Sequence, residues 1–465
     1  MKNQIGVVGL SVMGKNLAYN IADHGFLVSV YNRTPVRTQI AFKEYPGSGL
    51  DGFFTIKEFV ESLDSPKKIL LMVKAGAPVD QTIEQLLPYL SKGDLIIDGG
   101  NSYYLDTIRR TEYLNGKDLK FLGVGISGGE EGARKGPSIM PGGSKDAYAL
   151  VEPILTAISA KAEGKDCCSY LGPNGAGHFV KMVHNGIEYA DMQLICEAYS
   201  IMKNLMGLSP DEMTDIFSEW DKGELNSYLI GITADIFKKK DDKTGKPLLD
   251  MILDSAGQKG TGKWTAQISL EIGAPVPTIT AAVYERYLSA MKDERIQASK
   301  VLKGPPKKEI TDRGFIESIR CALYASKICA YAQGFSMLRA ASELNNWDLQ
   351  YSEIAKIFRG GCIIRAQFLN EISHEFDKNN QMVNLLTAPY FVSSINSYQE
   401  NWRKVISKSI ESGIAVSAFS SALSYYDNYR SKDMPMNLLQ AQRDYFGSHT
   451  YQRVDVDGLF HTQWV

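Results

Sequence analysis

Short apolar runs alternate with amphipathic stretches of helical length over the N-terminal part of the chain. The apolar runs have the length and near-continuous hydrophobicity of buried parallel strands, and they occupy residues 4–9, 27–31, 68–73, 94–98 and 120–123. From about Phe179 to Tyr429, long helical patterns replace this alternation. The pattern therefore predicts an α/β domain with a parallel sheet, followed by a large all-helical domain.

The first apolar run ends at a glycine-containing turn that leads directly into a helical pattern. This turn has the sequence Gly9-Leu10-Ser11-Val12-Met13-Gly14. Gly9 permits a tight turn, Gly14 allows the helix to pack close to the sheet, and the helix N-terminus offers N–H groups to a pyrophosphate. Glycine spacing alone is a weak signal, but its position between a strand and a helix strengthens it. We expect residues 9–14 to bind a dinucleotide in a Rossmann-type domain.

The end of the second predicted strand indicates which dinucleotide is bound. An NAD site would carry Asp or Glu there, for the ribose hydroxyls. This chain instead has Asn32-Arg33-Thr34. A guanidinium pairs with a 2′-phosphate that a carboxylate would repel, so the sequence predicts NADP. The alternative is an ordinary surface arginine after a strand.

Residues suited to a ligand follow the later strands as well. They are Val73-Lys74-Ala75, Asn101 within the segment 98–102, and Ser127-Gly128-Gly129, whose N–H groups can hold an anion. Ligands of open α/β sheets bind beyond the carboxyl ends of the strands, so these segments should line one crevice. Residues 132–143 are interpreted as a loop-rich wall of the site. The turn-dense residues 172–175 suggest the end of the nucleotide domain, giving domains at 1–176, 177–433 and, as a C-terminal tail, 434–465.

One helical stretch places four reactive side chains on one face. At about 100° per residue, an amine, an imidazole, an amide and a carboxylate fall together there: Lys181, His184, Asn185 and Glu188. Gly186 costs about 1 kcal/mol relative to Ala inside a helix, which suggests that another segment approaches closely. A polar helix with incidental charges is the alternative.

The helical region has three further features of interest. Residues 198–202 with 216–217, and 334–338 with 357–358, are similar segments about 140 residues apart, which suggests a duplicated unit. The glycine-rich loop around Lys259 could bind an anion, and Arg286 could bind a phosphate, although a salt bridge is the simpler interpretation. The tail contains Arg443, His449 and several aromatic residues, and it would fray unless it docks on a partner subunit.

Composition narrows the class of protein. The chain has 465 residues, 44% hydrophobic and 22% charged, with a net charge of −2, which fits two or three globular domains and gives no electrostatic signature for nucleic-acid binding. Six cysteines without CxxC spacing favour a reduced, cytoplasmic setting. The first apolar run leaves no room for a signal peptide, and no run approaches the roughly 20 residues of a membrane span. No metal-ligand cluster is evident, so we expect no metal.

Taken together, these motifs resemble the 6-phosphogluconate dehydrogenases, the decarboxylating enzymes of the pentose phosphate pathway. The resemblance covers nearly the whole length and rests on residues 9–14, 32–34, 98–102, 127–143, 181–189, 254–265 and 440–450. The visible departure is Ser11, where the family usually has Ala.

The resemblance implies a reaction and a role for each matched residue. Oxidation of the C3 hydroxyl of 6-phosphogluconate by NADP⁺, loss of CO₂ and protonation at C1 would give ribulose 5-phosphate. Lys181 and Glu188 would be the acid–base pair. The sugar acid would be surrounded by Asn101, Ser127, Gly128, Gly129, His184 and Asn185. Its phosphate would be held by Tyr189, Lys259 and Arg286, with Arg443 and His449 reaching in from the second subunit of a homodimer.

This chemistry carries expectations about proton affinity. Lys181 must be neutral to accept the hydroxyl proton, so its pKa should be lowered, and Glu188 must be protonated, so its pKa should be raised.

Two alternative functions remain: a dehydrogenase of the 3-hydroxyisobutyrate type, and a non-catalytic NADP-binding sensor.

Overall fold

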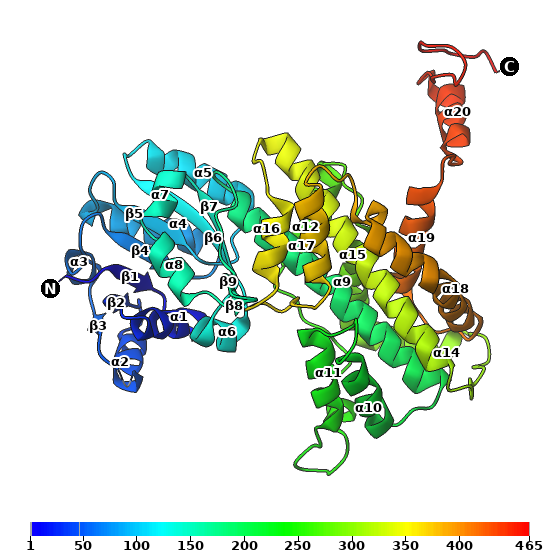
Figure 1. Cartoon of the computed structure of the whole chain (residues 1–465), viewed down its shortest axis with the longest axis horizontal. Coiled ribbons are helices and arrows are strands. Elements are labelled where there is room, and N and C mark those ends of the chain that lie inside the picture. Colours follow the sequence, from blue (N-terminus) through cyan, green and yellow to red (C-terminus); the bar gives the residue numbers. More distant parts are fainter. Residues whose placement is uncertain (1, 46, 465) are drawn as a thin grey trace.

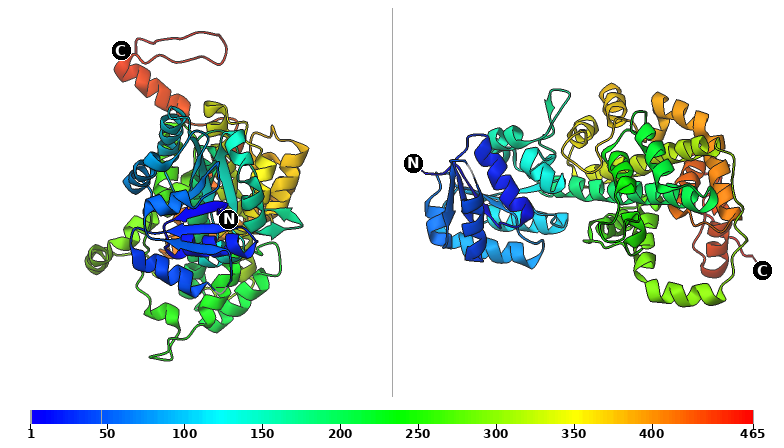
Figure 2. Two further views of the ribbon diagram at one scale, coloured as in Figure 1. Left: turned by 90° about the vertical axis from the view of Figure 1, so that its left-hand side faces the viewer. Right: turned by 90° about the horizontal axis from the view of Figure 1, so that it is seen from below.

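The computed structural model describes residues 2–45 and 47–464, in which a sheet domain and a helical domain lie side by side and a C-terminal segment projects from the helical domain (Figures 1 and 2). Met1, Pro46 and Val465, which belong to the predicted first domain and tail, lie outside the described residues. The predicted fold class, a Rossmann-type domain followed by a large all-α domain, is confirmed.

The sheet of the N-terminal domain has seven strands in the order β3-β2-β1-β4-β5-β6-β7, with every neighbouring pair parallel except β6 and β7. The strands are β1 (Ile5–Val8), β2 (Val28–Tyr31), β3 (Leu50–Phe53), β4 (Lys68–Leu71), β5 (Leu95–Asp98), β6 (Lys120–Ile126) and β7 (Ile139–Gly143). Leu95 and Ile97 belong to one hydrophobic cluster and Ile96 to another, because alternate residues of a strand face opposite sides of the sheet.

Helices cover both faces, which explains why the strands are apolar along their whole length. The helices of this domain are α1 (Val12–Asp23), α2 (Pro35–Glu44), α3 (Ile56–Glu61), α4 (Ala77–Leu86), α5 (Tyr104–Asn115), α6 (Gly129–Lys135), α7 (Lys145–Ala149) and α8 (Glu152–Ile158). A small hairpin, β8 (Lys161–Ala162) and β9 (Lys165–Asp166), follows them.

The interpretation of residues 132–143 as loop-rich is wrong. The helix α6 runs to Lys135, and β7 is a fully buried antiparallel strand at the edge of the sheet. Among the described residues, the outer side of β7 has only isolated bridges to Cys168 and Gly172, where Pro141 accepts a hydrogen bond from the Leu171 backbone, so a proline is tolerated at this edge. Gly142 serves packing rather than a turn, because a Cβ there would lie 2.3 Å from the backbone nitrogen of Gly177.

The helical domain is built around two long helices that pack against each other, α9 (Ala176–Leu205) and α15 (Phe315–Asn345). The other helices are α10 (Pro210–Trp220), α11 (Tyr228–Lys238), α12 (Thr261–Glu271), α13 (Pro277–Ala290), α14 (Lys292–Val301), α16 (Tyr351–Phe358), α17 (Leu369–Lys378), α18 (Pro389–Glu411) and α19 (Ser417–Arg430). The helix pair α9–α13 recurs as α15–α19 at nearly the same spacing along the chain, which supports the proposed duplication without testing the domain limits.

The C-terminal segment contains α20 (Met436–Gly447) and an irregular loop closed by an isolated bridge between Tyr451 and Phe460, and it stands clear of the domains (Figures 1 and 2). Its local order comes from Asp444, whose buried carboxylate accepts hydrogen bonds from the Thr462 backbone and the Trp464 indole. Within the described residues, no helix is long and apolar enough to cross a membrane.

Candidate active site

The helix α9 is held against the sheet by glycines on both elements. A Cβ at Gly125 in β6 would lie 2.4 Å from the Cβ of Lys181, and one at Gly177 would lie 2.3 Å from the Met140 carbonyl oxygen in β7. Small residues are thus required for α9 to approach the strands so closely. This packing places Lys181 beside Ser127, the first residue after β6.

The four side chains predicted on one face of α9 do come together, and they are buried or half-buried rather than solvated. Lys181 is 5% exposed, and its amine donates to Ser127 Oγ at 3.1 Å and to Asn185 Oδ1 at 2.6 Å. His184 Nδ1 lies 3.3 Å from the same amine. The opposite face of the helix, with Met182, Val183 and Ile187, packs into the core. The alternative of a polar helix with incidental charges is therefore wrong.

Burial sets the proton affinity of this cluster. Removal from water lowers the pKa of Lys181, with the Glu188 carboxylate opposing the shift. The same desolvation, together with the nearby Lys181 amine, holds the pKa of His184 well below its usual range. The direction expected for Lys181 is thus confirmed, and burial acts against the charged form of both groups.

Glu188 lies one turn beyond this cluster, at the boundary between the buried amine and a cationic surface. Burial raises the pKa of Glu188, the direction expected from the sequence, while Lys181, Arg286 and Lys259 act against the shift. The Arg286 guanidinium stacks on the Tyr189 ring at 3.4 Å from the ring centroid and donates to the Gly257 carbonyl in the Lys259 loop.

The salt-bridge interpretation of Arg286 is wrong. None of the ion pairs among residues 2–45 and 47–464 includes Arg286, so its charge is available to a ligand. Lys259 is exposed on the neighbouring loop. Lys259 and Arg286 therefore form a cationic surface next to Glu188, with the buried Tyr189 ring beneath the guanidinium.

Gly186 provides the close approach that its position in a helix suggested. A Cβ at Gly186 would lie 2.6 Å from Thr265 Cγ2 on α12. The Thr265 hydroxyl donates to the Met182 carbonyl at 2.8 Å, so α12 is attached to α9 at this point. Because α12 begins directly after the Lys259 loop, this contact fixes that loop relative to Lys181 and Glu188.

The glycine turn after β1 has the geometry of a dinucleotide cradle. Gly9 has φ +97°, and a Cβ at Gly14 would lie 1.9 Å from the Gly9 carbonyl oxygen, so side chains are excluded at both positions. Asn32 Oδ1 accepts a 2.9 Å hydrogen bond from the Leu10 backbone and fixes the turn. Ser11 is exposed at the start of α1, so its hydroxyl needs no partner within the protein.

The residues predicted to contact the adenosine 2′-phosphate are accessible. Arg33 and Thr34 are exposed beyond β2, and no ion pair in the described part of the chain engages Arg33. Val73 and Ala75 are half-buried and Lys74 is exposed, all directly after β4. The cradle, the free guanidinium and these strand ends together fit NADP.

The sequence did not identify the wall opposite Ser127. A Cβ at Gly128 would lie 2.5 Å from the Gly361 carbonyl oxygen, so the segment after α16 closes over this loop. The neighbouring Cys362 is buried, which raises its pKa to about 12, and the Lys181 amine partly offsets that shift. Paired glycines at 360–361 in an otherwise helical region were the only available signal.

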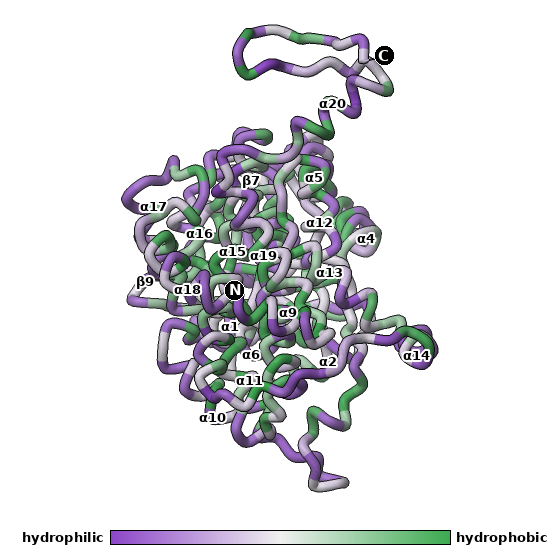
Figure 3. Tube along the Cα trace, turned by 90° about the vertical axis from the view of Figure 1, so that its right-hand side faces the viewer, coloured by the Kyte–Doolittle hydropathy of each residue, from purple (hydrophilic) through white to green (hydrophobic). Residues whose placement is uncertain are grey.

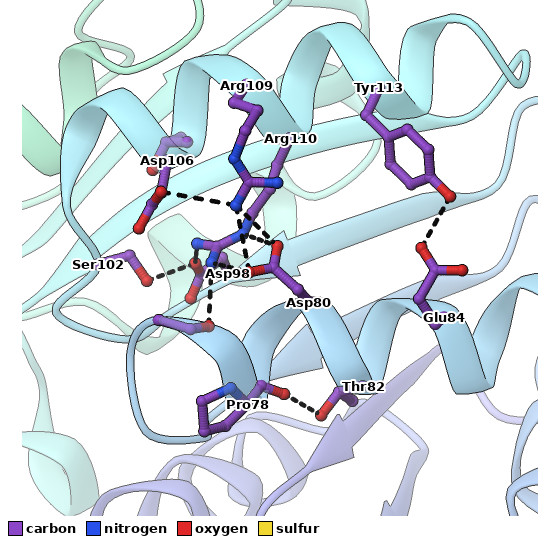
Figure 4. Close-up of polar contacts among 12 residues, drawn as sticks. Pro78, Asp80, Thr82, Glu84, Asp98, Ser102, Asp106, Arg109, Arg110 and Tyr113 are labelled. Carbon is purple, nitrogen blue, oxygen red and sulfur yellow. Dashed lines mark hydrogen bonds and ion pairs between the residues drawn. The ribbon is translucent and has the colours of Figure 1, made fainter.

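Arg110 and His178 were also not singled out from the sequence, and Asp98 was included only as part of the segment 98–102. All three are buried, and the first two hold the loop that carries the exposed side chain of Asn101 (Figure 4). Charged residues at core positions can be recognised only when their burial is known.

Arg443 and His449 are exposed on the C-terminal segment, away from the site on α9 of their own chain (Figure 1). A single chain therefore does not bring them to the substrate residues. Within the described residues, no group of three or more His, Cys, Asp or Glu side chains is arranged to hold a metal ion.

Comparisons with known proteins agree over the full length of the chain. Residues 4–172 match the family model of the NAD binding domain of 6-phosphogluconate dehydrogenase, and residues 177–464 match that of its C-terminal domain. The NADP⁺-dependent decarboxylating 6-phosphogluconate dehydrogenase of Bacillus subtilis is 59% identical over 100% of this chain and 99% of its own length. The decarboxylating 6-phosphogluconate dehydrogenase of Escherichia coli K12 is 57% identical with the same coverage.

A solved structure shares both the sequence and the fold. Plasmodium falciparum 6-phosphogluconate dehydrogenase, described as apo and in complexes with NADP⁺ and with 6-phosphogluconate, is 45% identical. It superposes with a TM-score of 0.96 over 99% of this chain and 100% of its own. The chain therefore belongs to the 6-phosphogluconate dehydrogenase family.

Proposed function

We propose that this enzyme oxidises and decarboxylates 6-phosphogluconate to ribulose 5-phosphate and CO₂ while reducing NADP⁺, with Lys181 as general base and acid and Glu188 as general acid. The observation that supports the residue assignment most directly is the buried amine of Lys181. It is hydrogen-bonded to Ser127, directly after β6, and to Asn185.

Lys181 can accept a proton because burial lowers its pKa and favours the neutral amine. When protonated, the amine becomes a buried cation next to the former hydroxyl, which has become a carbonyl oxygen. A buried cation polarises that carbonyl and stabilises the negative charge that develops as CO₂ leaves. One side chain thereby serves as base before decarboxylation and as electrostatic stabiliser during it.

The cofactor would lie on the glycine cradle, with residues 9–14 at the pyrophosphate, Asn32, Arg33 and Thr34 at the 2′-phosphate end, and Val73, Lys74, Ala75 and Asn101 along the strand ends. When bound, NADP⁺ supplies the acceptor for the hydride from C3. Arg33 gives preference for the phosphorylated nucleotide, since its guanidinium can pair with two phosphate oxygens.

Glu188 can then deliver a proton to C1, because burial raises its pKa and so favours the protonated carboxyl group more than water does. Its position between the Lys181 amine and the Tyr189–Arg286 stack supports this role, because a substrate that spans the site would pass it. Asn101, Ser127, Gly128, Gly129, His184 and Asn185 would hold the sugar acid. Tyr189, Lys259 and Arg286 would hold the phosphate.

The reaction is tested by mixing the protein with NADP⁺ and 6-phosphogluconate and following NADPH absorbance and CO₂ release. Lys181→Met should abolish turnover and leave NADP⁺ binding within about twofold, because the amine is not part of the cradle. Lys203→Met, on the exposed end of the same helix, should leave turnover unchanged. A sensor would bind NADP⁺ without turnover, and a 3-hydroxyisobutyrate-type enzyme would favour the unphosphorylated acid.

We further propose domains at 1–176, 177–433 and 434–465, and a homodimer in which the last segment docks on the partner. Hydrophobic and hydrophilic residues alternate along this segment (Figure 3). Large apolar side chains there are exposed to water, among them Leu438 at 64%, Phe446 at 72% and Leu459 at 72%. The helical domain exposes further apolar residues on and around α12–α14, including Leu270 at 82% and Leu302 at 74%. These two surfaces fit mutual burial in a two-fold dimer.

A mixing experiment tests whether Arg443 acts in the other subunit. Lys181→Met and Arg443→Met should each be nearly inactive as homodimers. After co-refolding, heterodimers contain one site with an intact Lys181 and an intact partner Arg443, so about one quarter of all sites should recover. No recovery in proven heterodimers would contradict the exchange of tails.

All six cysteines are free, which supports a reducing, cytoplasmic setting.

A further inference from the structure

Arg110 on α5 connects two loops that follow neighbouring strands of the sheet. Its side chain is 1% exposed, and its guanidinium donates to Asp80 at 2.8 and 3.0 Å and to the Gly76 carbonyl at 3.0 Å, both after β4 (Figure 4). Its third nitrogen reaches the Asp98 carboxylate, at the end of β5, at 3.4 Å. One planar group thus has partners on both loops.

Asp98 passes this restraint on to the backbone of its loop. Its carboxylate accepts from the Gly100 backbone at 3.1 Å and from the Ser102 hydroxyl at 2.6 Å. Asn101 lies between these two anchored residues and is exposed. The other loop contains Val73, Lys74 and Ala75 directly before Gly76. Arg110 therefore fixes the backbone of two adjacent loops at the carboxyl ends of β4 and β5.

The same turn of α5 also contacts the helix that carries Lys181. Thr107, one turn before Arg110, has its hydroxyl 2.7 Å from His178 Nδ1, and His178 lies one turn before Lys181 on α9. His178 is buried and packs close to Gly123 of β6. One turn of α5 thus contacts both the loops after β4 and β5 and the helix α9.

We propose that Arg110 is a positioning residue for hydride transfer, which sets the distance between the nicotinamide side of the crevice and the Lys181 helix. This inference rests on the proposed function, because it assumes that residues 73–75 and Asn101 contact NADP. Removing the guanidinium contacts should leave the substrate residues on α9 in place and loosen the two loops that contact the cofactor, one of which carries Asn101.

The test uses the full-length enzyme with Arg110→Lys, which keeps the charge but cannot satisfy three acceptors in one plane. The matched control is Arg109→Lys, since Arg109 is the adjacent residue, is largely exposed and also pairs with Asp80 (Figure 4). We expect Arg110→Lys to raise the KM for NADP⁺ about tenfold and to increase the deuterium isotope effect on kcat with C3-deuterated substrate. The dissociation constant of 6-phosphogluconate, measured without cofactor, should change by a smaller factor than the KM for NADP⁺, because Asn101 is the one proposed substrate contact on these loops.

Equal parameters for the two variants, or equal losses of cofactor and substrate affinity, would overturn the proposal. If Arg110→Lys does not fold, Ser102→Ala tests the proposal instead, because it removes only the 2.6 Å hydrogen bond to Asp98. It should raise the KM for NADP⁺ and the isotope effect on kcat in the same direction. A wild-type enzyme without turnover would refute the proposed function alone. Fluorescence titration of NADP⁺ would then still compare the Arg110 and Arg109 variants.

Discussion

Lys181 and Asn185 form a buried pair one turn apart on α9, with the Lys181 amine donating to Asn185 Oδ1 at 2.6 Å. The amide oxygen orients the amine but carries no charge that would stabilise the ammonium form. Desolvation therefore dominates, and the pKa of Lys181 falls. A neutral partner at this position is a condition for a lysine that acts as a base.

Asn185→Asp should move the acidic limb of the kcat/KM profile to higher pH. A carboxylate beside the amine favours the charged form, so the pKa of Lys181 rises by about one unit or more and the neutral base is lost at a higher pH. The measurement is kcat/KM for 6-phosphogluconate over a range of roughly pH 5 to 9. Asn204→Asp, at the exposed end of the same helix, should leave the profile in place. A profile that is unshifted in Asn185→Asp would argue against Lys181 as the base.

Glu188→Gln should separate hydride transfer from protonation. The amide cannot donate the C1 proton, so steady-state turnover should fall about 100-fold or more, while the earlier oxidation step proceeds. Rapid mixing should then show a burst of NADPH close to one per site, followed by a slow phase. Loss of the burst together with turnover would mean that Glu188 is needed before decarboxylation.

Gly186→Ala should destabilise the protein even though Ala is the better helix former. The added methyl would lie 2.6 Å from Thr265 Cγ2, so α12 must move, at a cost of about 1–3 kcal/mol. The same displacement shifts the Lys259 loop, so the KM for 6-phosphogluconate should rise. Thermal unfolding and steady-state kinetics measure both effects. Gly223→Ala is the control, because the nearest atom to a Cβ there, the Trp220 carbonyl oxygen, is 4.0 Å away.

Arg33→Met should raise the KM for NADP⁺ about tenfold or more and leave the weak use of NAD⁺ nearly unchanged. Only the phosphorylated nucleotide loses a charge-assisted pair. Lys43→Met, exposed on α2, controls for a general loss of positive charge on that helix. An equal rise in KM for both nucleotides would show that Arg33 supports the loop and does not read the 2′-phosphate.

The sequence by itself determined the features that depend on neighbours along the chain. Helical spacing placed Lys181, His184, Asn185 and Glu188 on one face, and the order of strand, turn and helix located the cradle at Gly9 and Gly14. Gly186 likewise indicated a close contact, since a glycine inside a helix lowers the stability of that helix. These signals are local, and local geometry follows from a few consecutive residues.

Only the tertiary structure decided which distant groups meet. Residues 139–143 contain Pro and two Gly and were assigned to a loop, yet they form a buried strand because α9 packs against glycines there. Arg286 could have been a surface salt bridge, but it stacks on Tyr189. Arg110 and Gly361 gave little signal, because burial and contacts between loops far apart in sequence arise only when the sheet, α5 and α9 are assembled. The pKa of Lys181 likewise depends on desolvation, a property of the packed core and not of the residue type.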